Sequence, residues 1–431
     1  MQLLDKLKSK QAHLGVVGMG YVGLPLMMEF AKVGFTVTGI DLDQRKVDQV
    51  NAGESYVLDV PTAELKELVK AGRIKATSDY AVVSELDTIN ICVPTPLRKT
   101  RDPDVSFIVN SVNEIVKYLH PGQLIILEST TYPGTTEELI MPLLEETGLK
   151  VGEDVYLAFS PERVDPGNKH YTTKNVPKVV GGVTATCGEM AVALYSQSID
   201  TIVRVESTQV AEMVKLLENT FRSVNIALVN ELALMCNKMK INVWEVIDAA
   251  ATKPFGFMPF YPGPGLGGHC IPIDPFYLSW KAKLAGFEAR FIELAGQVNS
   301  FMPLHVLHKI NEGLNLDSKC IRGSKILIIG VAYKKDIDDL RESPALDVIE
   351  LLHERGATIS FADPYVEQVS ILDTTYEPVE LSAETIKDFD CVVILTNHQV
   401  LDYELIYQNS RLIVDTRNAL KGKNDPKIIT L

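Results

Sequence analysis

The chain has 431 residues, which is too long for one compact core, so two or three domains are expected. Its formal net charge of -14 argues against a nucleic-acid partner or an anionic membrane surface, because phosphate recognition requires a basic face. No apolar run has the length of a membrane span or the form of a signal peptide, and the six cysteines include no CxxC pair, so we expect a cytoplasmic protein without disulfides or a metal site.

The first third of the chain alternates between strand and helix patterns. The run HLGVVG, residues 13–18, reads as a buried parallel strand, a helical pattern follows, and TVTGIDLD reads as a second strand. The runs TINICVP, QLIILEST and VYLAFSPE continue the alternation. This order predicts a doubly wound parallel sheet, and we assign residues 1–205 to this Rossmann domain.

A glycine motif, GMGYVG at residues 18–23, follows the first predicted strand and opens the first predicted helix. Asp41 closes the second strand 18 residues after Gly23, a context that indicates dinucleotide binding and not merely a tight turn. The glycines would let the backbone approach a pyrophosphate at the helix N-terminus. A carboxylate at Asp41 would bind the ribose hydroxyls and repel a 2′-phosphate, which predicts NAD; Arg45 leaves NADP open as the alternative.

The middle of the chain is predicted to be helical. No glycine or proline occurs between Glu189 and Lys253, which permits long uninterrupted helices. The stretch TQVAEMVKLLENTFRSVNIALVNELALMCNKMK has a helical apolar period and would be about 45 Å long, enough for a bridge between domains or a subunit interface. Asn242 and Glu245 resemble a capping box for the next helix. We assign residues 206–315 to a central helical domain.

Three polar side chains share one face of the long helix. Lys215 and Asn219 are four residues apart, and Arg222 follows three residues later. A lysine beside an amide can hold a developing oxyanion, and a desolvated lysine can accept a proton. The alternative interpretation is a solvated helix face.

A loop rich in glycine and proline carries a cysteine. Of residues 254–275, 11 of 22 are glycine or proline, and Cys270 follows Gly267 and Gly268, where the backbone can approach a ligand. A thiolate at this position would be a nucleophile, and Asp274 could activate water; the alternative is a structural cysteine. His269 has no second His/Cys pair nearby, so we expect no metal here.

Polar residues follow two of the predicted strands of the first domain. Glu162, Arg163 and Asp165 follow one strand, and Glu128 and Thr130 follow another. Doubly wound folds bind their ligands at the carboxyl ends of parallel strands. These five residues are therefore candidates for ligand contacts.

The α/β alternation resumes late in the chain. The runs SKILIIG, ATISFAD, CVVILT and RLIVDT predict a second, smaller α/β domain at residues 316–431. It has no glycine fingerprint. Lys334 and Lys335 occupy the expected phosphate-binding turn, which suits a phosphorylated group other than a second dinucleotide or, alternatively, a solvated charged turn.

Together these motifs resemble the UDP-glucose/UDP-N-acetylmannosamine dehydrogenase family over essentially the whole chain. The motifs are GMGYVGLP, VPTP, STTYPGTT, FSPERVDPGN, KLLENTFRSVNIALVNE, PGPGLGGHCIPIDP and VAYKKDIDDLRESPA. The resemblance implies an α/β protein with an N-terminal Rossmann domain for NAD, a central long-helix dimerisation region and a smaller C-terminal Rossmann-like domain for UDP.

The resemblance also assigns roles to residues. Cys270 matches the family nucleophile, Lys215 the catalytic lysine, Asn219 its oxyanion-stabilising partner, Asp274 the water-activating aspartate and Glu162 the glutamate near the reacting carbon. Thr130 is counted with these catalytic residues. The expected cofactor contacts are Gly18, Gly20, Tyr21, Val22, Gly23, Asp41, Arg45, Pro94, Thr95, Glu128, Thr130 and Arg341. The expected substrate contacts are Arg163, Val164, Lys215, Asn219, Arg222, Gly265, Tyr333 and Lys334.

The implied reaction is an NAD-dependent four-electron oxidation of a sugar C6 alcohol. A first hydride transfer gives an aldehyde, Cys270 adds to form a thiohemiacetal, a second hydride transfer gives a thioester, and water releases the carboxylate. The segments FSPERVDPGN and PFYPGPGLGGHCIPIDPFYL look most like UDP-N-acetylglucosamine 6-dehydrogenases of bacterial or archaeal surface-polysaccharide synthesis. UDP-N-acetylmannosamine and UDP-glucose are the alternative substrates.

Two other classes of protein share parts of this pattern. A hydroxy-acid or hydroxyacyl dehydrogenase also combines a Rossmann domain with long helices, but it transfers one hydride and needs neither Cys270 nor a second α/β domain. A non-catalytic NAD sensor would bind the cofactor without turnover. The partners expected are a UDP-sugar and further copies of this chain, in a homodimer or larger oligomer.

Overall fold

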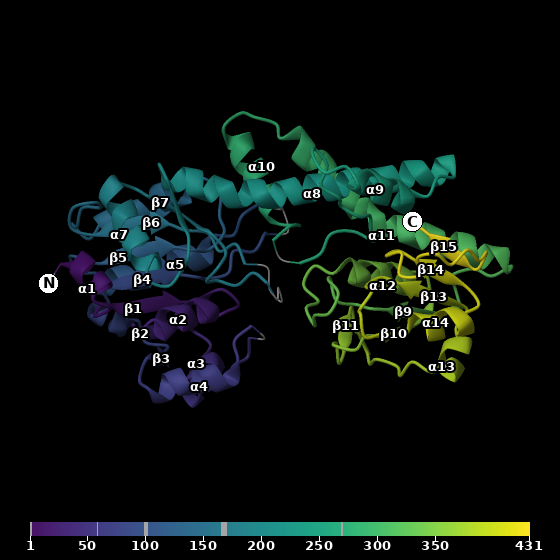
Figure 1. The fold of residues 1–431 in the computed structure, drawn as a ribbon, viewed down its shortest axis with the longest axis horizontal. Coiled ribbons are helices and arrows are strands. Elements are labelled where there is room, and N and C mark those ends of the chain that lie inside the picture. Colours follow the sequence, from purple (N-terminus) through teal and green to yellow (C-terminus); the bar gives the residue numbers. More distant parts are fainter. Residues whose placement is uncertain (1, 58, 99–101, 165–169, 269) are drawn as a thin grey trace. The chain divides into compact units, whose positions relative to one another are not determined.

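A computed structural model describes residues 2–57, 59–98, 102–164, 170–268 and 270–431 (Figure 1). The chain divides into two compact units. The first unit comprises Met1–Glu218 and Trp280–Gly286, and the second comprises Asn219–Ser279 and Phe287–Leu431.

The first unit is built on an eight-stranded sheet. Its strand order is β3-β2-β1-β4-β5-β6-β7-β8, and the first six strands run parallel in the nucleotide-binding order. The strand β7 is antiparallel to β6, and β8 is parallel to β7. The strands are β1 (His13–Val17), β2 (Thr36–Ile40), β3 (Ile74–Thr77), β4 (Thr88–Ile91), β5 (Leu124–Leu127), β6 (Tyr156–Phe159), β7 (Lys178–Gly182) and β8 (Ile202–Val205).

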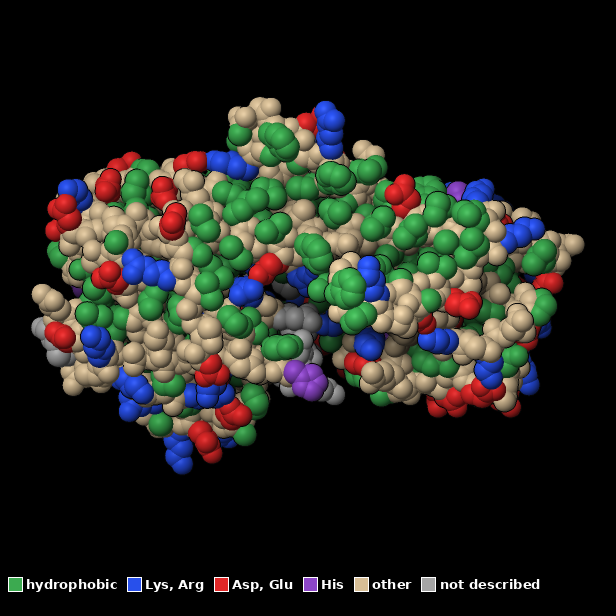
Figure 2. Space-filling model, turned by 45° about the horizontal axis from the view of Figure 1, so that its top comes forward, with side chains coloured by type: hydrophobic (Ala, Val, Ile, Leu, Met, Phe, Trp, Pro, Cys, Tyr) green, Lys and Arg blue, Asp and Glu red, His purple; other side chains and the backbone are tan. Residues whose placement is uncertain are grey.

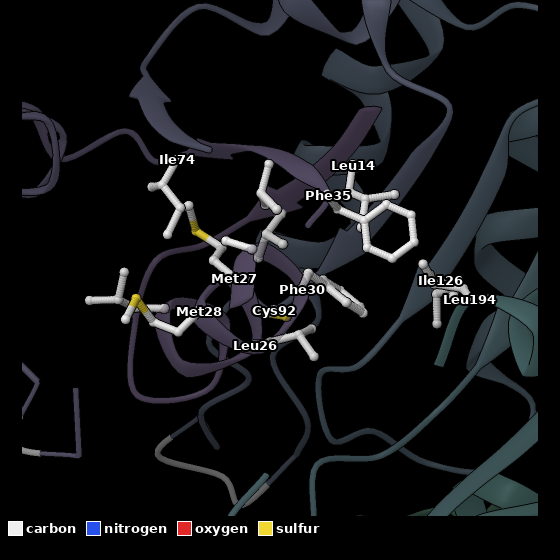
Figure 3. Close-up of a cluster of buried hydrophobic side chains, with 14 of the residues drawn as sticks. Leu14, Leu26, Met27, Met28, Phe30, Phe35, Ile74, Cys92, Ile126 and Leu194 are labelled. Atoms are coloured by element: carbon white, nitrogen blue, oxygen red, sulfur yellow. The ribbon is translucent and has the colours of Figure 1, made fainter. Parts of the chain in front are cut away.

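Helices cover both faces of this sheet, which explains why inner strands such as β4 and β5 are buried at every position. In β5, Leu124 and Ile126 join one core cluster, whereas Ile125 and Leu127 join another. Figure 3 shows the first cluster, which combines Ile126 with side chains of α2 and α7. The helices of this unit are α1 (Leu3–Lys8), α2 (Gly23–Lys32), α3 (Gln44–Ala52), α4 (Thr62–Lys70), α5 (Ser106–Ile115), α6 (Met141–Glu145) and α7 (Ala185–Tyr195), with the short 3-10 helices η1 (Tyr80–Glu85) and η2 (Val116–Tyr118) and the π-helix η3 (Thr136–Ile140).

The second unit contains a five-stranded parallel sheet in the order β10-β9-β13-β14-β15. Helices α11 (Arg290–Leu316) and α12 (Pro344–Glu354) pack on one face, and α13 (Ala383–Lys387) and α14 (Tyr403–Asn409) on the other. The strands are β9 (Lys325–Ile329), β10 (Thr358–Ala362), β13 (Cys391–Ile394), β14 (Ile413–Asp415) and β15 (Ile428–Thr430), with a hairpin of β11 (Val369–Ile371) and β12 (Thr374–Tyr376).

Two helices contribute residues to both units. Helix α8 (Thr208–Met239) has 32 residues, close to the length expected from the missing glycine and proline, and α10 (Asp274–Leu284) follows the cysteine loop. Helix α9 (Val243–Ala251) begins where predicted, because the Asn242 side chain accepts hydrogen bonds from the backbone N–H groups of Trp244 and Glu245.

Candidate active site

The glycine motif forms the turn between β1 and α2. Gly18 has φ 91°, and a Cβ there would lie 2.5 Å from the carbonyl oxygen of Cys92. A Cβ on Gly23 would lie 1.9 Å from the carbonyl oxygen of Gly18, so this turn requires glycine at both positions. A Cβ on Gly20 would meet no described atom within 4 Å. Packing among the described residues therefore does not explain Gly20, and the approach of a pyrophosphate to this position stays a prediction.

Asp41 follows β2 and is tied to the glycine turn. Its carboxylate accepts hydrogen bonds from the backbone N–H groups of Met19 at 2.9 Å and Asp43 at 3.0 Å. Lys46 lies 3.3 Å from the same carboxylate, whereas the exposed Arg45 guanidinium binds Asp43. The cation that pairs with Asp41 is thus Lys46, which the sequence pattern did not single out.

The other expected cofactor contacts of this unit lie on loops after parallel strands. Tyr21 and Pro94 are exposed, and Val22, Thr95 and Thr130 are partly buried.

A buried glutamate anchors the loop that carries Thr130. Glu212 of α8 accepts hydrogen bonds from the backbone N–H of Gly134 at 2.6 Å, the backbone N–H of Thr136 at 3.0 Å and the hydroxyl of Thr136 at 2.7 Å. Burial raises the pKa of Glu212 to about 7, although these hydrogen bonds act in the opposite direction. Glu212 precedes Lys215 by three residues, so it joins this loop to the part of α8 that carries the lysine.

Glu162 lies in the loop after β6 and is held by that loop. Its Oε1 accepts hydrogen bonds from the backbone N–H groups of Arg163 at 2.8 Å and Val164 at 2.9 Å. Burial would raise the pKa of Glu162, but the charge of Lys178, the N–H groups and the charge of Lys215 outweigh it and hold this pKa below its ordinary value. Glu162 is therefore ionised at neutral pH.

Two cations of the first unit contact the chain near Glu162. The Nζ of Lys215 donates a hydrogen bond to the backbone carbonyl oxygen of Glu162. The Arg163 guanidinium pairs with Glu218 and donates to the carbonyl oxygen of Pro177. The structure thus brings the predicted residues Glu162, Arg163 and Lys215 together.

Lys178 is a third cation, which sequence reasoning missed. Its Nζ lies 2.7 Å from Oε2 of Glu128 and 3.6 Å from Oε2 of Glu162. The sequence KVVGG identifies a strand but does not reveal its antiparallel direction, which brings Lys178 to the edge where β5 and β6 end.

In the second unit, the predicted residues Asn219, Arg222, Cys270 and Asp274 are connected. Asn219 and Asp274 are buried, the Asn219 amide donates to the Asp274 carboxylate, and the Arg222 guanidinium donates to the Asn219 side-chain oxygen. The backbone N–H of Asp274 donates to the carbonyl oxygen of Cys270 at 2.8 Å. The partly buried cysteine therefore lies on the turn that leads into α10.

The glycines before Cys270 are packed against Tyr333. A Cβ on Gly267 would lie 2.5 Å from Cβ of Tyr333, and a Cβ on Gly268 would lie 2.9 Å from its ring. Gly268 has φ 82°, and its N–H donates to the carbonyl oxygen of Arg341. We expected these glycines to leave room for a ligand; in the structure Tyr333, a predicted substrate contact, takes that space.

Two buried amides hold the start of the cysteine loop. The N–H of Gly263 donates to the side-chain oxygen of Asn230 at 3.0 Å, and the Asn230 amide donates to Asn299 at 2.9 Å. The Asn299 amide donates to the carbonyl oxygen of Ser223 at 3.1 Å. Gly265, a predicted substrate contact, follows this anchor, and a Cβ there would lie 3.0 Å from Pro344.

Arg417 is a further cation that sequence reasoning missed. It follows β14, its Nε donates to the carbonyl oxygen of Leu395 at 2.8 Å, and a Cβ on Gly263 would lie 2.5 Å from its Nη1. Burial lowers the pKa of Arg417 to about 10, and no acidic side chain in the described part of the chain forms an ion pair with it. The sequence did contain a signal for Arg417, because a charged residue directly after the strand run RLIVDT lies at the edge of the sheet where such folds bind ligands.

The other predicted contacts of the second unit lie on the loop between β9 and α12. Arg341 is exposed and forms an ion pair with Asp339 at 2.6 Å. Lys334 is partly buried, whereas Lys335 is exposed. Asp165 and His269 lie outside the described residues.

Comparisons with known proteins cover both units. Three family models match in order: the NAD binding domain of the UDP-glucose/GDP-mannose dehydrogenase family at residues 12–199, its central domain at 209–300 and its UDP binding domain at 327–422. The chain is 37% identical to the UDP-N-acetyl-D-glucosamine 6-dehydrogenase of Pseudomonas aeruginosa, over 83% of this chain and 84% of that protein. It is 34% identical to the UDP-N-acetyl-D-mannosamine dehydrogenase of Pyrococcus horikoshii, over 95% and 96% respectively.

A solved structure of the UDP-D-ManNAc dehydrogenase from Pyrococcus horikoshii is also similar. It covers 97% of this chain and 98% of its own chain at 34% identity, with a TM-score of 0.88. The fold and the matched domains define a nucleotide-sugar dehydrogenase. The chain belongs to the UDP-glucose/GDP-mannose dehydrogenase family.

The comparisons confirm the predicted family, the α/β fold with two Rossmann-like domains and NAD as the cofactor. The domain limits near residues 205 and 315 and the roles of single residues stay predictions. Among the residues described here, no helix has both the length and the apolar character needed to cross a membrane.

Proposed function

We propose that this protein oxidises the C6 alcohol of a UDP-N-acetylhexosamine to the carboxylate with two NAD per sugar, and that the sugar is UDP-N-acetylglucosamine. The observation that carries this proposal is the arrangement of the cysteine loop. The backbone N–H of Asp274 donates to the carbonyl oxygen of Cys270, and the Asp274 carboxylate accepts a hydrogen bond from the Asn219 amide. The glycines of this loop pack on Tyr333. Relatives named for both epimers support an N-acetylhexosamine. The motifs of the cysteine loop and of the loop after β6 favour the gluco epimer.

NAD, when bound, accepts a hydride in each of the two oxidations. In the first, the alcohol loses a hydride and a proton, and we assign the Lys215 amine, which donates a hydrogen bond to the backbone carbonyl oxygen of Glu162, to that proton transfer. The Cys270 sulfur then bonds to the aldehyde carbon and its proton passes to the former carbonyl oxygen, with Asn219 and Lys215 stabilising the oxyanion. Loss of the second hydride and that proton leaves a thioester.

Water completes the reaction by cleaving the thioester to the carboxylate and the free thiol. The Asp274 carboxylate is assigned to accept the proton of this water. Glu162 is ionised and has no proton to donate. Its carboxylate can therefore stabilise positive charge or accept a hydrogen bond near the reacting carbon. In the second unit, Arg417 and Lys334 provide positive charge for a diphosphate.

The proposal is tested with purified protein, NAD and a panel of UDP-N-acetylglucosamine, UDP-N-acetylmannosamine, UDP-N-acetylgalactosamine and UDP-glucose. Chromatography of the products should reveal a UDP-uronate, with the highest kcat/KM for UDP-N-acetylglucosamine. A higher kcat/KM for UDP-N-acetylmannosamine would overturn the choice of epimer, and the absence of any uronate would overturn the proposed reaction.

Asp41→Asn should weaken the preference for NAD over NADP. The substitution removes the negative charge that repels a 2′-phosphate while retaining one hydrogen-bond acceptor for the glycine turn. We expect the ratio of kcat/KM values to fall by about tenfold, which corresponds to ~1.4 kcal/mol. Asp43→Asn, which removes a charge two residues away, is the control. An unchanged ratio in Asp41→Asn would show that Asp41 does not select the cofactor.

An apolar stripe on α8 supports association of two copies. Phe221, Leu228 and Met235 lie seven residues apart on one helix face, and their exposed fractions are 46%, 51% and 48%. Figure 2 shows many hydrophobic side chains on the face of the molecule that is turned forward. Three large apolar side chains in one row are typical of an interface.

We propose that two copies associate through this stripe, so Leu228→Asp should convert the dimer to monomer by burying a carboxylate in the interface. Light scattering after size-exclusion chromatography measures the mass. Leu372→Asp is the matched control: Leu372 is 61% exposed with φ 52°, a backbone conformation that Asp tolerates. A dimer that persists in Leu228→Asp, or a wild-type protein that is monomeric, would contradict this interface.

A further inference from the structure

Two carboxylates and one ammonium group are buried together at the carboxyl edge of the large sheet. The exposed fractions of the side chains are 0% for Glu128, 5% for Lys178 and 12% for Glu162. Buried charges are costly unless they are paired and hydrogen-bonded. Such a cluster at the edge where doubly wound folds bind ligands calls for a specific role.

The reversed direction of one strand creates this cluster. In the antiparallel pairing of β6 and β7, Ala158 lies opposite Gly182 and Phe159 lies opposite Gly181. The first residue of β7, Lys178, therefore lies at the edge where β5 and β6 end with Glu128 and Glu162 close behind them. A parallel β7 would have carried Lys178 to the opposite edge.

Glu128 fixes the position of the ammonium group. Its Oε2 is 2.7 Å from Lys178, and its Oε1 accepts hydrogen bonds from the Asn90 amide at 2.8 Å and from the Tyr195 hydroxyl. Both carboxylate oxygens of Glu128 are thus engaged by buried protein groups, which leaves Glu162 as the less tightly bound partner of Lys178.

The groups that face the cluster are few. Burial raises the pKa values of Tyr195 and of the Cys92 thiol well above their ordinary values, so both are neutral. Lys178 and Lys215 are the cations that act on Glu162.

We propose that Lys178, anchored by Glu128, is a positioning residue that pairs with the Glu162 carboxylate and fixes the loop whose carbonyl oxygen accepts a hydrogen bond from Lys215. In this arrangement Glu128 is an internal anchor and not a cofactor contact. The inference rests on the proposed function, because Lys178 acts only through Glu162 and Lys215.

The test compares Lys178→Met with Lys178→Arg in the full-length enzyme. Without the cation, Glu162 should bind a proton more readily, so the acid limb of the pH profile of kcat/KM should move to higher pH by about one unit in Lys178→Met. Lys178→Arg retains the charge and should keep the wild-type profile. The double variant Glu128→Gln/Lys178→Met removes both the carboxylate charge of Glu128 and the ammonium charge of Lys178, so no unpaired buried charge is left on Glu128. This variant should fold, and the acid limb of its pH profile should be shifted as in Lys178→Met.

A merely structural lysine would lower activity at every pH without moving the acid limb. An unshifted limb in both methionine variants would therefore overturn the proposal, as would an arginine variant that is shifted as far as the methionine variant.

A second readout does not depend on activity. The lowered pKa of Glu162 stabilises the folded state above the ordinary pKa of a glutamate, and this contribution is lost as the pH falls through the folded-state value. Glu162→Gln should therefore lower the Tm more at pH 7 than at pH 3. This difference between the two pH values should be much smaller in a protein that already carries Lys178→Met. Equal effects in both backgrounds would refute the coupling. A wild-type enzyme that oxidises no UDP-sugar would instead refute the proposed function.

Discussion

Replacing Cys270 with serine should slow steady-state turnover by about a thousandfold or more. The oxygen nucleophile adds less readily to the aldehyde, and the ester it would form hydrolyses more slowly than a thioester. Binding of NAD and UDP-sugar should be retained, because serine is close to cysteine in size. Rapid-mixing measurements of NADH should show at most two equivalents per active site before turnover stalls.

The control for this experiment is Cys320→Ser, which changes an exposed cysteine outside the cysteine loop and should leave turnover at the wild-type value. Normal steady-state turnover by Cys270→Ser would remove the cysteine from the mechanism.

Replacing Lys215 with methionine should lower kcat by about 10²–10⁴-fold, the range for loss of a general acid–base group. Methionine keeps an unbranched apolar stem but loses the amine that donates to the Glu162 carbonyl oxygen. The KM for the sugar should change less than kcat, because the amine acts chiefly on the reacting alcohol. Lys238→Met, at an exposed lysine near the end of α8, is the matched control.

Lys215→Arg separates charge from proton transfer. A guanidinium supplies the positive charge but does not deprotonate at ordinary pH, so this variant should stay impaired. A wild-type kcat in Lys215→Arg would contradict proton transfer by Lys215 and leave it only an electrostatic role.

Much of the fold was predictable because burial on two faces leaves a plain sequence signal. The strand LIIL at Leu124–Leu127 is apolar at every position, since alternate residues enter different core clusters. Gly18 and Gly23 were likewise predictable, because the turn between β1 and α2 admits no side chain at either position. The cap at Asn242 followed from its side-chain chemistry.

The direction of β7 was not predictable, because parallel and antiparallel strands share the same apolar pattern. For that reason the sequence did not reveal that Lys178 pairs with Glu128 and Glu162. Glu212 was not predicted as a site residue, because a single glutamate in a helical pattern gives no sign that N–H groups of a distant loop will bind its carboxylate. The cysteine loop was only partly understood, since nothing in its glycines indicated that Tyr333, more than sixty residues later, would pack on them.

The most direct test of the central claim is the number of NADH molecules formed for each UDP-sugar consumed, measured to completion with the sugar limiting and NAD in excess. Removal of four electrons through a Cys270 thioester predicts two NADH per sugar and one UDP-uronate. One NADH per sugar, with an aldehyde or ketone as the product, would contradict it.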